Sequence, residues 1–222
     1  MKGIEDLVKI GFFAEVHGNI DYLVTVTDFL IQKEAVERVF FLGGDYRDLD
    51  EFFIFKKKQE RGTEKYGDAE FLKDVSEFLA KPDEEGSENA RSEYEGIFVR
   101  VPEPGAAVYR DKNVANKQFE MVGSSILLLV NDPSELGEED LSNADVVFHG
   151  CDSKYGVRKE GKCYFVCPGH LRGKTYDESP ASFGVCTLGE KEAVVSFYDV
   201  RGGLLKQEEL QMDRRGKIIV RG

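Results

Sequence analysis

Two short segments near the start of the chain combine residue types that bind metals and move protons. In the first, residues 10–19 (IGFFAEVHGN), an apolar run ends at Glu15 and is followed by His17. In the second, residues 39–45 (VFFLGGD), another apolar run ends at Asp45. Carboxylate and imidazole groups are common protein ligands of divalent transition metals. The two segments therefore predict a polar site, with a bound cation as its sharper interpretation.

The elements that must position these residues follow from the pattern around them. Each apolar run is typical of a buried strand of a parallel sheet. Between the runs, apolar residues recur at helical spacing, which predicts a helix from Asn19 or Asp21 through about Lys33, and a second strand over residues 38–42. A right-handed strand–helix–strand unit brings the two carboxyl ends to one edge of a sheet, where α/β proteins build their sites.

The second half of the chain is dominated by strand patterns. Strands are expected at residues 97–101, 107–109, 125–130, 145–148, 163–166, 184–188, 193–198, 204–210 and 217–220. Residues 201–203 read as the turn of a C-terminal hairpin. Residues 50–105 differ from the rest and are interpreted as a variable insertion, with a helix at 68–81 and an acidic surface loop at 82–95. The whole chain is expected to form one domain.

Composition excludes several classes of function. The chain has 222 residues, 41% hydrophobic and 32% charged, which is typical of a globular protein. A net charge of −12 argues against nucleic-acid and anionic-membrane binding, which require basic surfaces. A phosphorylated substrate stays compatible, because a bound cation can reverse the local field. No apolar stretch is long enough to span a membrane, and the first ten residues lack the apolar centre of a signal peptide, so a cytoplasmic location is expected.

The four cysteines all lie in the last third of the chain, at Cys151, Cys163, Cys167 and Cys186. Without a secretion signal, free thiols are the expected state, and metal ligation is the alternative. Cys163 and Cys167 occupy alternating positions of one expected strand, so core packing is favoured for that pair.

Taken together, these segments resemble the calcineurin-like metallophosphoesterase superfamily, in particular its small bacterial phosphodiesterase branch. The first family motif, Asp-x-His-Gly-Asn after a strand, corresponds to residues 15–19, with glutamate in place of aspartate. The second, Gly-Asp, matches residues 44–45, and further motifs correspond to segments from residue 112 to 183. The resemblance covers about residues 8–200. It implies an α/β sandwich of two mixed β-sheets packed face to face and flanked by helices.

The resemblance also implies a site in which two cations clamp a phosphate and activate a water. One ion would use Glu15, His17, Asp45 and Ser153; the other would use Asp45, Asn113, Asn131 and Cys151. His17 and Asn113 would take the catalytic roles, with Asn113 positioning the phosphate. Several ligands depart from the family pattern. Ser153 is a poor ligand when neutral, so the first ion keeps three credible ligands. Asn131 is uncharged and Cys151 favours zinc, so the second ion's ligand set is weakened.

Two functions follow from this altered ligand set, and the sequence leaves both open. The first is a pseudoenzyme or binding module of little or no hydrolase activity, with a protein partner. The second is a metal-dependent phosphodiesterase or phosphatase that holds one Mn, Fe or Zn ion and acts on a phosphorylated small molecule or phosphodiester. Its single site would be rebuilt from His17, Asp45, Cys151 or His170. Alternatively, His149 ends a strand facing away from the site, and Cys151 and Cys167 pack as small apolar side chains.

Overall fold

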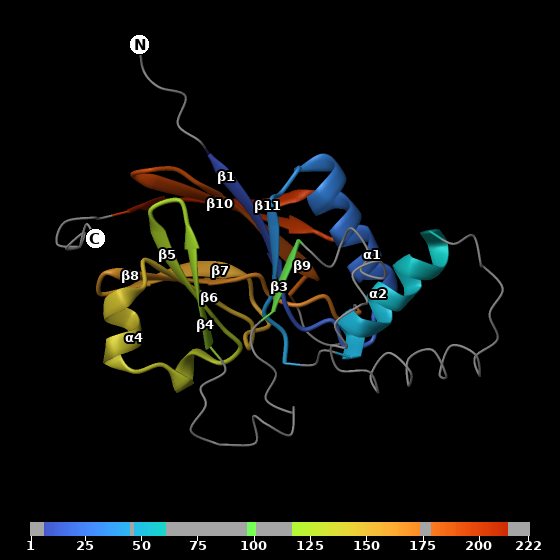
Figure 1. Cartoon of the computed structure of the whole chain (residues 1–222), viewed down its shortest axis with the longest axis horizontal. Coiled ribbons are helices and arrows are strands. Elements are labelled where there is room, and N and C mark those ends of the chain that lie inside the picture. The colour runs from blue at the N-terminus through green and yellow to red at the C-terminus, as the bar shows by residue number, and fades with distance from the viewer. Residues whose placement is uncertain (1–6, 45–46, 61–96, 101–116, 174–178, 213–222) are drawn as a thin grey trace, which may run out of the picture.

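The computed structural model describes residues 7–44, 47–60, 97–100, 117–173 and 179–212, and within these ranges the strands form two sheets (Figure 1). The first sheet has the order β11 (Leu204–Gln211), β10 (Glu192–Asp199), β9 (Ser182–Leu188), β1 (Val8–Phe13), β2 (Arg38–Phe41), β3 (Phe98–Arg100). The second has the order β4 (Lys117–Val122), β5 (Ser125–Val130), β6 (Val146–His149), β8 (Cys163–Cys167), β7 (Gly156–Glu160).

Both sheets mix parallel and antiparallel pairs. In the first sheet β1, β2 and β3 are parallel, and β9, β10 and β11 pair in antiparallel fashion beside them. In the second sheet β5, β6 and β8 are parallel, with antiparallel β4 and β7 at the edges. The predicted α/β sandwich of two mixed sheets is therefore confirmed.

The sheets pack face to face through side chains that alternate along each strand. On β1, Ile10 and Phe12 point into the core between the sheets, and Phe13 points to the opposite face. Phe148 of β6 closes this core from the other sheet, with its ring 4.9 Å from that of Phe12 and 5.8 Å from that of Phe40 between centroids. Burying each such ring stabilises the fold by about 1.5–3 kcal/mol.

Helices cover the outer faces of the sandwich (Figure 1). On the first sheet lie α1 (Ile20–Asp28), the π-helical turn η1 (Phe29–Lys33) that continues it, and α2 (Arg47–Glu60). On the second sheet lies the short α4 (Glu138–Asn143), preceded by the 3₁₀ turn η4 (Pro133–Glu135). Each sheet therefore packs apolar side chains on its outer face as well as in the core between the sheets.

Most of the expected elements in the described ranges are confirmed. The first helix ends at Lys33 as predicted, although its last turn is π-helical. The strands β4 and β7 and the helix α4 were not predicted. The expected helix at 68–81, the loop at 82–95 and the strands at 107–109 and 217–220 lie outside the described residues, and the insertion and single-domain organisation stay predictions. No helix in the described ranges has the length and apolarity needed to cross a membrane.

Candidate functional site

The loop that follows β1 has an unusual backbone. Glu15 and His17 adopt left-handed conformations with φ of 28° and 52°, and Gly18 follows at 75°. For residues with a side chain such conformations cost about 1–3 kcal/mol each, and they persist where the surroundings impose them. One restraint is the buried Asp48 in the first turn of α2, which accepts a hydrogen bond from the Gly18 amide at 2.9 Å. In this loop the Glu15 and His17 side chains lie against each other.

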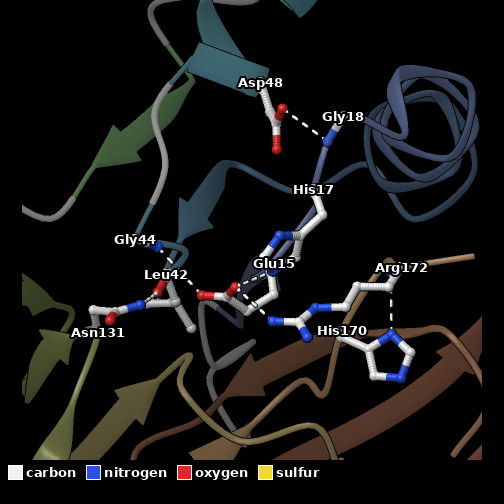
Figure 2. A network of polar contacts seen from close by, with 9 residues as sticks. All are labelled: Glu15, His17, Gly18, Leu42, Gly44, Asp48, Asn131, His170 and Arg172. Carbon is white, nitrogen blue, oxygen red and sulfur yellow. Dashed lines mark hydrogen bonds and ion pairs between the residues drawn. The ribbon is translucent and has the colours of Figure 1, made fainter. Parts of the chain in front are cut away.

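The Glu15 carboxylate is the centre of the resulting polar cluster (Figure 2). Its Oε2 lies 2.6 Å from His17 Nε2 and 3.2 Å from Arg172 Nη2. Its Oε1 accepts a 3.4 Å hydrogen bond from the backbone amide of Gly44, directly past β2. The side chain of Glu15 is 19% exposed and that of Arg172 is 27% exposed, so the two charges meet largely out of solvent.

Arg172 comes from the loop after β8, and hydrogen bonds fix that loop at several points. The Arg172 amide donates to His170 Nδ1 at 3.1 Å, and the Leu171 amide donates to the backbone carbonyl of Glu15 at 3.0 Å. The His170 carbonyl accepts from the amide of the fully buried Ser182 at 2.8 Å. No role for Arg172 was predicted from the sequence.

The carboxyl ends of β5 and β6 carry the other half of the predicted site, and here the polar groups connect the two sheets. Asn131 Nδ2 donates to the carbonyl of Leu42 at 2.8 Å, and the Asn131 carbonyl accepts from the amides of Gly150 and Cys151 at 3.0 Å each. Gly150 lies so close that an added Cβ would stand 2.0 Å from the Leu42 carbonyl oxygen. The Asn131 side chain thus ties β5 to the end of β2.

The remaining candidates in this half are neutral at physiological pH. Cys151 is exposed at the surface, and partial burial together with the nearby Asp132 and Asp152 raises the pKa of its thiol. Burial lowers the pKa of His149 to about 4, and its Nδ1 has no hydrogen-bond partner in the described structure. Burial raises the pKa of Cys167 to about 12. Protonated thiols are poor metal ligands.

The structure places only some of the predicted ligands. Glu15 and His17 meet directly, and Asn131 lies beside Gly44 at the same edge, where its amide faces that glycine. Cys151 and Ser153 lie on the loop after β6, and Asp45 and Asn113 lie outside the described residues. Over the described ranges, no group of three or more His, Cys, Asp or Glu residues is arranged to hold a metal ion.

No family model and no curated protein matches this sequence. Solved structures do match. The chain is similar to a predicted phosphoesterase from Streptococcus pneumoniae, with a TM-score of 0.54 and 14% identity over 92% of this chain and 98% of the other. YfcE, a phosphoesterase from E. coli, gives 0.50 and 18% over 93% and 100%, and Vps29 from Chaetomium thermophilum gives 0.52 and 12% over 93% and 100%.

The chain has the calcineurin-like metallophosphoesterase fold. At identities this low the likeness concerns the fold alone, and that fold is common to proteins named as phosphoesterases and to Vps29. The activity of this chain must therefore be argued from its own residues.

A metallophosphoesterase fold implies a divalent ion beside the loop after β1, and the residues there test that implication. An ion at Glu15 would need this carboxylate as a ligand at about 2.0–2.2 Å. Its Oε2 is instead shared by His17 and Arg172. The Arg172 guanidinium brings a positive charge to that oxygen. Like unit charges 4 Å apart repel by about 4 kcal/mol near a protein surface, and a second charge on the ion doubles that. The described residues do not fit a resident divalent ion.

Proposed function

We propose that this chain is a binding module built on the metallophosphoesterase fold, with little or no hydrolase activity. One observation carries the proposal: the Glu15 carboxylate, which would be the first anionic ligand of a metal, is paired with His17 and Arg172. Two-metal hydrolysis requires cations at the site to activate water and neutralise the phosphate. A carboxylate balanced by a guanidinium no longer attracts them.

The state of the second half supports the same proposal. Asn131 is uncharged, and its Nδ2 donates to the Leu42 carbonyl. Partial burial raises the pKa of the Cys151 thiol. Neither supplies the negative charge that a second cation needs. Among the described residues that contact Glu15, the Arg172 guanidinium is already paired with the carboxylate, so its charge is not available to a phosphate. The favoured partner is therefore a protein rather than a phosphorylated small molecule.

The alternative is an active phosphoesterase with a single Mn, Fe or Zn ion. The observation in its favour is the strained loop that brings Glu15 and His17 to 2.6 Å, because strain of this kind gathers at functional sites. Asp45 would complete the ligands, as the sequence predicted.

One experiment decides between these functions. The protein is purified without chelator, its bound metal is measured, and a chromogenic phosphodiester is offered with added Mn²⁺. If the chain is a binding module, we expect less than about a tenth of an equivalent of bound metal. Any turnover of the diester should then be the same in the wild type and in Asp45→Asn. Stoichiometric metal, together with turnover that Asp45→Asn removes, would establish the alternative.

A further inference from the structure

Arg172 approaches the one carboxylate oxygen that His17 also contacts. The distances to Glu15 Oε2 are 3.2 Å from Arg172 Nη2 and 2.6 Å from His17 Nε2. In Figure 2 the guanidinium and the imidazole lie beside the same end of the carboxylate. A metal bound by Glu15 and His17 would have to contact that oxygen and that ring nitrogen. The guanidinium and the ion would therefore compete for the same oxygen.

The position of Arg172 is built into the fold. Its own amide is bound to His170 Nδ1, and the preceding residue, Leu171, is bound to the backbone of Glu15 and is fully buried. The loop after β8 is thus joined to Glu15 twice, by the backbone of Leu171 and by the side chain of Arg172. With the backbone placed in this way, the Arg172 side chain reaches the Glu15 carboxylate, and the planar guanidinium loses little freedom per hydrogen bond formed.

We propose that Arg172 is the permanent cation of this site and that its charge excludes divalent metals from Glu15 and His17. The inference rests on the proposed function, since it explains why the module holds no metal. It implies a latent metal site: when the guanidinium is removed, the carboxylate and the imidazole become available to an ion such as Mn²⁺, with water completing the coordination.

The test compares substitutions that separate the charge of Arg172 from its bulk. Arg172→Met keeps the long apolar stem and removes the charge, whereas Arg172→Lys keeps a positive charge and is the matched control. Mn²⁺ binding is measured by calorimetry and by electron paramagnetic resonance on each full chain, and circular dichroism shows that each variant is folded. Arg172→Gln replaces Arg172→Met in the comparison if the latter does not fold.

The expected result is Mn²⁺ binding to Arg172→Met at least about tenfold tighter than to the wild type or to Arg172→Lys, because a nearby like charge has been removed. Adding Glu15→Gln to Arg172→Met should abolish the gain. If folded Arg172→Met and Arg172→Gln bind Mn²⁺ no more tightly than Arg172→Lys, the inference is overturned. The proposed function is unaffected by that result as long as the wild type is metal-free. Stoichiometric, tight binding by the wild type itself would overturn both.

Discussion

The two halves of the candidate site, after β1 and β2 and after β5 and β6, hold their polar groups in different ways. After β1, the Glu15 carboxylate contacts His17 and pairs with Arg172 at 3.2 Å, and after β2 the Gly44 amide donates to it. At the ends of β5 and β6, Asn131 and Gly150 join the two sheets, and the buried His149 is neutral. In the half after β1 and β2, the side chains interact through charge. In the half after β5 and β6, they hold the two sheets together.

This difference indicates which half a substitution should damage. Substitutions at the ends of β5 and β6 should destabilise the fold strongly, because they disturb the Asn131–Leu42 hydrogen bond or the close approach of Gly150 to the Leu42 backbone. Substitutions at the ends of β1 and β2 should cost less stability, because the groups there are partly exposed and interact through side chains.

The largest effect is expected at Gly150. A Cβ there would stand 2.0 Å from the Leu42 carbonyl oxygen, which is backbone and cannot turn aside. Gly150→Ala should therefore lower the free energy of unfolding by about 3 kcal/mol or more, measured by urea denaturation. Gly156→Ala, where nothing lies within 4 Å of the added atom, is the control and should change stability far less. Equal effects at the two glycines would show that the sheets are not tied at this point.

The second effect concerns His149 and pH. Burial is the main reason that its pKa falls from 6.5 to about 4 in the folded chain. Between these values the unfolded state binds the proton more readily, so stability falls as the pH drops from about 6.5 to 4, by up to about 3 kcal/mol. His149→Leu removes this titration. The unfolding free energies of the two proteins, measured from pH 7 to pH 4, should diverge by that amount, and parallel curves would be inconsistent with a buried neutral histidine.

The sequence predicted the fold better than the site. The apolar runs before Glu15 and Asp45 made the strands β1 and β2 predictable, because buried parallel strands require continuous apolar residues. The edge strand β7 was missed since its sequence, GVRKE, is polar and mostly exposed, and its pairing with β8 stabilises it. An edge strand such as β7 forms hydrogen bonds with one neighbour and can expose most of its side chains, so its sequence need not show an apolar pattern.

The electrostatics of the site escaped prediction for a different reason. Arg172 lies 157 residues from Glu15 along the chain, and only the packing of the two sheets brings them together. Asn131 was predicted as a ligand from its place in a motif, and that role stays a prediction. The hydrogen bond from its Nδ2 to the carbonyl of Leu42 was not predicted. Which partner a polar side chain selects depends on tertiary geometry, and a motif specifies only where the residue falls. A basic residue within a motif-bearing loop, as in CPGHLRG, is the one signal that could have pointed to Arg172.

The smallest effect is also the most direct test of the central claim, that Arg172 is the counter-ion of Glu15. A double-mutant cycle with Glu15→Gln and Arg172→Met measures their coupling from unfolding free energies. The account predicts about 1–2 kcal/mol for this partly buried pair, against less than about 0.5 kcal/mol for the more exposed Arg158–Glu160 pair as a control. A coupling no larger than that of the control would contradict the claim.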